Sequence, residues 1–217
     1  MATVASPYGF RAINHIGGTP YAGSTRLLPI TTATPAVTNA TPIYYGQVVG
    51  LATAANSGTV VVVPTLGSGA AGAGTQFPSG VLGVFVGCTY SDPVTGVQQF
   101  NQFWPGNAST DAIAYIVDDP EVCFQVQASA AVAQTQLGRN AHLTQVQTAA
   151  LGAGGGNPAT GNSLTTINAA TVAVTASFPF RIVDFVDSPT STVGDAFTDC
   201  IVKFNGIYHS YNNPTGI

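Results

Sequence analysis

Residues 121–127 read EVCFQVQ, and this stretch decides the class of fold. Val122, Phe124 and Val126 are apolar, and they alternate with Glu, Cys and Gln side chains. Successive side chains of a β-strand point to opposite faces, so a period of two is typical of a strand with one face in a core. The stretch therefore predicts a half-buried β-strand.

Similar short apolar or β-branched runs occur along the chain between Gly, Pro and Asn turns. They predict further strands at residues 43–51, 59–63, 81–86, 113–117, 171–175, 178–186 and 200–204. A short helix is predicted at residues 128–137, where Gly138 ends it. Strands this short and frequent favour an all-β fold, an antiparallel β-sandwich or barrel with at most one or two short helices.

The chain has 217 residues, which suits one β-rich domain, and we place it at residues 43–217 with Gly-rich loops at 67–74 and 152–161. Residues 1–42 carry Gly and Pro too often for long helices or central strands, so we expect an extended N-terminal arm there. Aromatic side chains interleaved in the arm gain by burial. Either the protein's own core or a neighbouring molecule must hold it.

The scarcity of charge is the most unusual feature of the composition. Asp, Glu, Lys and Arg make up 6% of the chain, against roughly 25% in a typical soluble domain. Mean hydropathy is nevertheless positive, at +0.29. Interface centres are depleted in charge because charged groups are costly to desolvate, so this composition favours a surface that is buried against partners. The alternative is a monomer coated with Thr and Ser.

Charge and cysteine usage exclude several classes of function. The net charge is −4, and the five basic residues are scattered, so we expect no nucleic-acid partner. The three cysteines form no disulfide framework or zinc motif and are interpreted as free thiols of a reducing cell, with one bridge left open. The N-terminus lacks signal-peptide features and no apolar run is long enough to span a membrane, so we expect neither secretion nor a membrane partner.

No motif indicates catalysis, a cofactor or a metal. The stretch GSGAAG at residues 67–72 matches a dinucleotide fingerprint, but no helix follows it, so we interpret it as a surface loop. The acids around Pro120 (Asp118, Asp119 and Glu121) suit a solvated turn better than a calcium site. The three histidines are far apart in the sequence, and no serine or cysteine is paired with a base. We therefore expect a protein that is not an enzyme.

An aromatic cluster interrupts a polar stretch at residues 100–106, FNQFWPG. Phe103 and Trp104, the only tryptophan, lie within it. Such clusters anchor protein interfaces, where Trp and Tyr are enriched. A plug that covers the open end of a sandwich explains the cluster equally well, and both readings stay open.

The order of several short pieces resembles the head decoration, or capsid cement, proteins of tailed bacteriophages. The pieces are PYGFR at residues 7–11, GVFVGCTY at 83–90, FWPG at 103–106, DDP at 118–120, FQVQA at 124–128, RIV at 181–183, DSP at 187–189 and GDAFTD at 194–199. Together they spread over most of residues 7–204. The stretch from 149 to 170 and the tail from 206 to 217 are less similar to this family.

The resemblance implies a β-rich virion structural protein, a homotrimer that contacts the major capsid protein and is made in the cytoplasm of the host bacterium. We expect it to bridge capsid subunits on the outer surface of the head, because an acidic protein inside would face packed DNA. The candidate partner-binding residues are Tyr8, Phe10, Arg11, Tyr21, Phe103 and Trp104. The alternative function is a phage spike, adhesin or fibre-associated module that binds surface glycans.

Overall fold

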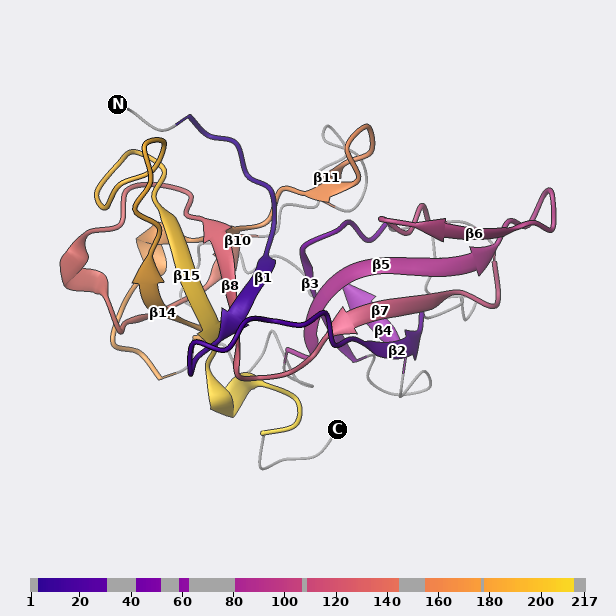
Figure 1. Ribbon diagram of the computed structural model, residues 1–217, viewed down its shortest axis with the longest axis horizontal. Coiled ribbons are helices and arrows are strands. Elements are labelled where there is room, and N and C mark those ends of the chain that lie inside the picture. The colour runs from indigo at the N-terminus through magenta and orange to yellow at the C-terminus, as the bar shows by residue number, and fades with distance from the viewer. Residues whose placement is uncertain are drawn as a thin grey trace.

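The computed structural model describes residues 4–30, 42–51, 59–62, 81–106, 109–144, 155–176 and 178–212. Over these ranges the protein is all-β, and two antiparallel sheets make up most of it (Figure 1). The prediction of an all-β sandwich or barrel is confirmed. Helical residues in this part of the chain form short 3₁₀ turns, namely η3 (Gln134–Gln136), η5 (Ala169–Thr171) and η6 (Gly206–Tyr208).

The first sheet, which we call sheet A, has five strands in the order β1-β8-β15-β14-β9. Their bounds are Arg11–His15 (β1), Val122–Gln127 (β8), Asp199–Phe204 (β15), Phe180–Phe185 (β14) and Asn140–Ala141 (β9). The stretch that alternates most clearly in the sequence forms β8, which lies between β1 and β15. Both of its faces are largely buried rather than one, and the N-terminal segment contributes at the end of the strand, where Ser6 N donates a hydrogen bond to Gln127 Oε1.

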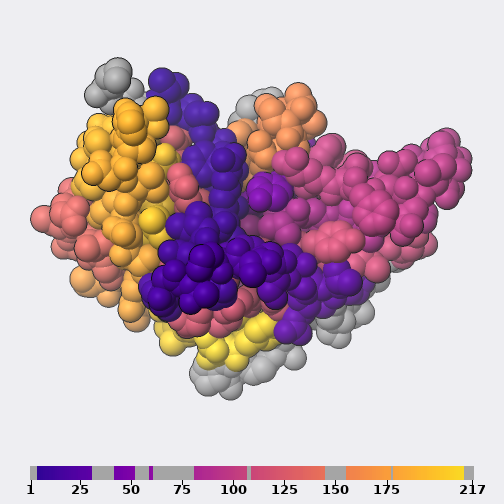
Figure 2. Space-filling view, in the orientation of Figure 1, coloured from indigo at the N-terminus to yellow at the C-terminus, as the bar shows by residue number. Residues whose placement is uncertain are grey.

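The second sheet, sheet B, has the order β2-β7-β5-β3-β4, and β6 pairs with the C-terminal half of β5. Its strands are β2 (Arg26–Pro29), β3 (Gln47–Leu51), β4 (Val60–Val62), β5 (Gly83–Ser91), β6 (Gln98–Asn101) and β7 (Ile113–Val117). The β5–β6 hairpin projects away from the rest of the protein, at the right of Figures 1 and 2. The predicted strand at 113–117 coincides with β7.

Two smaller antiparallel strand pairs complete the described strands. They are β10 (Leu143–Thr144) with β13 (Thr166–Ile167), and β11 (Gly156–Asn157) with β12 (Asn162–Ser163). The second pair is a hairpin and occupies part of the Gly-rich loop predicted at 152–161. The Gly-rich loop predicted at 67–74 lies outside the described residues.

Two hydrophobic clusters stabilise the fold. The first core lies mainly within sheet A, around Phe10, Phe124 and Phe180, and it also contains Val48 and Val84 of sheet B. The second core lies under sheet B, and its largest fully buried members are Trp104, Phe85, Leu82 and Ile116. Because the first core draws side chains from both sheets, the sheets are joined by buried contacts as well as by the chain.

Residues 4–30, the described part of the expected N-terminal arm, pack against both sheets. Strand β1 pairs with β8 along sheet A, and β2 pairs with β7 along sheet B. Phe10 is fully buried, and its backbone N donates to Gly46 O at 2.9 Å. A Cβ on Gly9 would lie 2.9 Å from that same oxygen, so the close approach requires glycine. The described part of this segment is therefore held by the protein's own core.

Two predicted elements are wrong. Only Gln134–Gln136 is helical within 128–137, because backbone groups there bond to distant partners, as when Ala128 N donates to Thr198 O. The strand predicted at 171–175 is absent, and Ala173 makes only an isolated bridge with Asn140. Asn168 caps the turn η5 at this point by accepting from Ala170 N. Beyond the bridge at Ala173 the chain turns towards solvent, and the Val174 side chain is 85% exposed.

Candidate functional site

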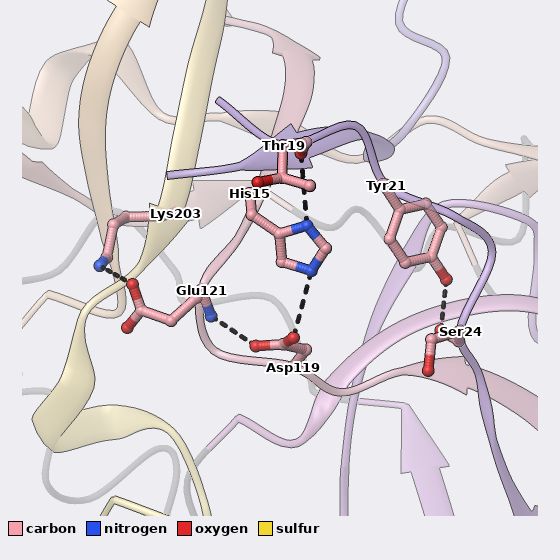
Figure 3. Close-up of polar contacts among 7 residues, drawn as sticks. All are labelled: His15, Thr19, Tyr21, Ser24, Asp119, Glu121 and Lys203. Atoms are coloured by element: carbon pink, nitrogen blue, oxygen red, sulfur yellow. Dashed lines mark hydrogen bonds and ion pairs between the residues drawn. The ribbon is translucent and has the colours of Figure 1, made fainter. Parts of the chain in front are cut away.

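The acidic turn between β7 and β8 ties distant segments together rather than leaving its carboxylates free (Figure 3). Asp119 Oδ2 lies 3.3 Å from His15 Nε2, and Asp119 Oδ1 accepts from Glu121 N at 2.8 Å. The other ring nitrogen of His15 lies 3.4 Å from Thr19 O. Glu121 pairs with Lys203 of β15 at 3.1 Å. These contacts connect the N-terminal strand to the last strand of sheet A.

Asp118 joins the opposite ends of the described chain. Its Oδ2 forms an ion pair with Arg26 Nε and accepts a hydrogen bond from Tyr211 Oη at 2.8 Å. The Arg26 guanidinium also lies over the Tyr211 ring, 5.0 Å from its centroid. Burial and the carboxylate raise the pKa of Tyr211 to about 12, so its hydroxyl remains a donor at neutral pH. Each acid of the turn has a protein partner, so the turn stabilises the fold by linking distant segments of the chain.

No group of three His, Cys, Asp or Glu side chains placed to hold a metal ion occurs among the described residues. No helix in the same part of the chain has the length and hydropathy that crossing a membrane requires.

A second polar contact fixes the N-terminal segment to sheet A. Tyr8 Oη donates to Asp199 Oδ1 at 3.1 Å, and the Arg11 guanidinium lies 4.5 Å above the Tyr8 ring. Burial, with the nearby Asp199 carboxylate, raises the pKa of Tyr8 well above its usual value. Burial also raises the pKa of Asp199, although the Tyr8 hydrogen bond acts in the opposite direction. Tyr8 and Arg11 therefore act within the protein, with Arg11 itself exposed.

The three cysteines and two of the three histidines are buried. Cys88, Cys123 and Cys200 are free and buried. Burial raises the pKa of Cys88 and of Cys200 to about 12, so these thiols stay protonated and weakly nucleophilic at neutral pH. Burial lowers the pKa of His142 and His209, and their rings pack against Phe178 and Phe204. Such histidines serve as packing groups.

Of the aromatic residues singled out by the sequence, two are in the cores. Phe10 and Trp104 are 0% and 1% exposed, so neither presents a surface to another molecule. Trp104 packs edge-to-face on Tyr90, with ring centroids 5.1 Å apart, and its side chain is part of the second core. Phe103 is half-buried and stacks on Tyr44 at 5.5 Å. Tyr21 is half-buried too, and its hydroxyl donates to Ser24 O. The six candidates therefore do not form one exposed site.

A surface that the sequence did not indicate lies on the projecting part of sheet B. We call β2, β5, β6 and β7, with the turn 92–97 between β5 and β6, the blade. Directly paired residues of antiparallel strands point to the same face. The pairing therefore gives one row across the blade of Phe100, Thr89, Ile113 and Pro29, and a second row of Leu27 and Tyr115. We call the face that bears these rows the outer face.

The outer face carries large apolar side chains that are open to solvent, beside the polar Thr89 and Gln98. Phe100 is 71% exposed, Leu27 57% and Ile113 37%. The opposite face of the same strands carries Cys88, Tyr90, Ala114 and Ile116, which are buried in the second core. At the tip, Val94 is 91% exposed and Val97 56% exposed. The blade therefore has hydrophobic side chains on both faces, and among the described residues the second core covers only one of them.

The charges are concentrated away from the blade. Arg26 is the only charged residue in the strands of sheet B, whereas β1, β14 and β15 of sheet A carry five. Two acids, Asp92 and Asp111, lie just outside these strands at the tip of the blade. There Asp92 accepts from Val94 N, and Asp111 accepts from Ser91 and Ser109. These bonds hold the pKa of Asp111 at about 2, so it is ionised.

The comparisons with known proteins found nothing: no family model, no curated protein and no solved structure matches this chain.

Proposed function

We propose that this protein is a non-enzymatic structural subunit of a virion, a capsid decoration protein that bridges major capsid protein subunits on the outside of a phage head. The single observation that carries the proposal is the uncharged, apolar outer face of the blade on a chain that is otherwise poor in charge. Large exposed apolar patches on soluble proteins mark interaction sites. The resemblance noted in the sequence supplies the kind of assembly.

Burial of this face against neighbours would stabilise a shell under internal pressure. Transfer of apolar surface from water contributes about 25 cal/mol per Å². A subunit that contacts several shell proteins at once gains further, because each contact after the first is intramolecular. Trimer formation, which the resemblance implies, would multiply the number of contacts. The charged side of the molecule, sheet A, would then face solvent.

The acidic net charge supports a position outside the shell. A chain with nine acids and five basic residues is repelled by packed nucleic acid, which carries a dense negative charge. The alternative, a glycan-binding adhesin, needs aromatic and carboxylate side chains exposed in a surface groove, for which Trp104 and Asp118 are the candidates. Trp104 is buried, and Asp118 is engaged by Arg26 and Tyr211, so no observation favours that function.

The test is attachment to assembled heads. Heads would be assembled from the major capsid protein of the same virus, mixed with the purified chain and separated by sedimentation. We expect saturable co-sedimentation, with the bound chain accessible to protease from outside. Failure to bind at any stoichiometry would refute the proposal, as would finding the chain only beneath the shell in a reconstruction of native particles.

A further inference from the structure

The last described segment of the chain, residues 206–212, runs from sheet A to sheet B, and we call it the strap (Figure 1). It begins shortly after β15 with the turn η6 and then forms a parallel bridge to Val81, shortly before β5. Val81 N donates to Tyr208 O at 2.7 Å, and Ser210 N donates to Val81 O at 2.9 Å. The strap therefore joins the end of a strand in one sheet to the start of a strand in the other.

His209 lies in the middle of the strap and is 0% exposed. Its ring packs against Phe204 of β15, with centroids 5.1 Å apart, and against Tyr211 of the strap, with centroids 5.2 Å apart. Phe204 and Val81, which the strap contacts, both belong to the first core. Opening of the strap would therefore uncover part of this core.

The hydrogen bonding of His209 requires a neutral ring. Tyr211 N donates to His209 Nδ1 at 3.4 Å, so Nδ1 is the unprotonated nitrogen and Nε2 carries the hydrogen. Nε2 is itself buried without a hydrogen-bond partner in the described part of the chain. Acid would add the second proton at Nδ1, which would turn this acceptor into a donor and set two N–H groups against each other. Protonation therefore breaks a hydrogen bond within the strap and leaves a buried positive charge.

The groups around the ring act in both directions. Burial, the largest effect, lowers the pKa of His209, whereas the Asp118 and Asp119 carboxylates and neighbouring carbonyl groups favour the charged ring. Asp118 is already engaged by Arg26 and Tyr211. The pKa of Tyr211 is raised to about 12, so its hydroxyl adds no charge, and β15 contributes an uncharged aromatic ring. The closed strap therefore favours the neutral histidine.

We propose that the strap is an acid-sensitive latch, which is closed over the junction of the two sheets while His209 is neutral and opens when this ring is protonated. Tyr211 couples the ring to the rest of the contact, because it also donates through its side chain to Asp118 Oδ2 at 2.8 Å. In the open strap His209 is in water and titrates near its ordinary pKa of about 6.5. As long as the closed ring stays neutral, the ratio of open to closed strap should rise roughly tenfold between pH 7.5 and 5.5.

The experiment is hydrogen exchange of the full chain, followed at single amides by NMR at pH 7.5, 6.5 and 5.5 and corrected for the intrinsic effect of pH on exchange. The Val81 and Ser210 amides report opening of the strap, and the amides of β8 report unfolding of sheet A. At each pH the strap amides should exchange faster than those of β8, because opening of the strap does not require unfolding. Their corrected rates should rise roughly tenfold from pH 7.5 to 5.5.

Three variants identify the group that responds to acid. His209→Gln places a neutral amide in the strap, so the rise in exchange at low pH should disappear. His142→Gln is the matched control, because His142 is also a buried histidine but lies outside the strap, and this variant should keep the rise. Tyr211→Phe removes only the hydroxyl that bonds to Asp118, so it should raise strap exchange at every pH and leave the dependence on pH intact.

Strap amides that exchange no faster than those of β8 would overturn the proposal, because the strap would then open only when the whole protein unfolds. A rise that persists in His209→Gln would overturn it too, since another group would be responsible. If that variant does not fold, the ring resonances of His209 in the natural chain decide: titration near pH 6.5 with unchanged strap exchange would exclude the latch. The test needs no capsid protein, so its failure would leave binding to heads as a separate question.

Discussion

Replacing Phe10 with alanine is expected to destabilise the whole protein, because this side chain is part of the first core. Phe10 is 0% exposed, and its ring lies 4.8 Å from the Phe180 ring and 6.1 Å from the Phe124 ring. Truncation of a buried phenylalanine costs about 3–5 kcal/mol, from lost transfer free energy and from the cavity that remains. For a protein of this size such a loss lowers Tm by roughly 10 °C.

Denaturant unfolding followed by tryptophan fluorescence measures this effect directly. Trp104 is the only tryptophan, and it is buried in the second core, whereas Phe10 belongs to the first. A shift of its unfolding midpoint in Phe10→Ala would therefore also report that the two cores unfold together. Val4→Ala is the control, because Val4 belongs to the same segment but is 76% exposed. It should change the free energy of unfolding by less than about 0.5 kcal/mol.

The result would separate two roles of the N-terminal segment. If residues 4–30 served only to reach a neighbouring subunit, Phe10→Ala would weaken attachment and leave the isolated chain as stable as before. A loss of less than about 1 kcal/mol, similar to that of the Val4 control, would refute the reasoning that places Phe10 in the core.

Three other predictions follow from buried groups. Burial lowers the pKa of His142 and His209 in the folded state, so the unfolded chain binds more protons and the free energy of unfolding should fall as pH drops below about 6.5. Urea unfolding at pH 7.5 and 5.5 should show this fall, and a His209→Gln variant with the same pH dependence as the natural chain would contradict the prediction for that residue. The three cysteines should react with a thiol reagent within minutes only in denaturant, and rapid labelling of the native chain would show that one is accessible. Gly156→Ala should lower the free energy of unfolding by about 1–3 kcal/mol, because the new Cβ would lie 2.1 Å from the Tyr44 ring. Gly17→Ala, whose Cβ would meet nothing within 4 Å, should be nearly neutral, and equal shifts in Tm for the two variants would contradict this packing.

The alternation of residues in 121–127 and the β-branched run at 113–117 were sufficient to predict strands, because the period of side chains in a strand is a local property. The same local reasoning failed at 171–175. Whether a β-branched run forms a strand depends on a neighbouring strand with free backbone groups, and here the run ends in an exposed turn. Asn168 caps the preceding 3₁₀ turn, and this signal was present in the sequence but was not used.

The candidate site was harder to predict than the strands. Tyr8, Phe10 and Trp104 were singled out for their chemistry, but aromatic residues serve both cores and interfaces, and composition does not distinguish the two. In the sequence Phe100 is part of the aromatic cluster at 100–106, whereas nothing singles out Leu27 or Ile113. Their alignment on one face depends on the registers of β6, β5, β7 and β2, which join residues far apart in the chain.

The sequence by itself determined the all-β class and the poverty of charge, because strand period and composition need no knowledge of long-range contacts. Only the tertiary structure decided that the described N-terminal segment belongs to both sheets and that the apolar surplus is exposed on the outer face of the blade. The physical reason is that a strand fixes which of its side chains share a face, whereas the pairing of distant strands fixes which face is covered.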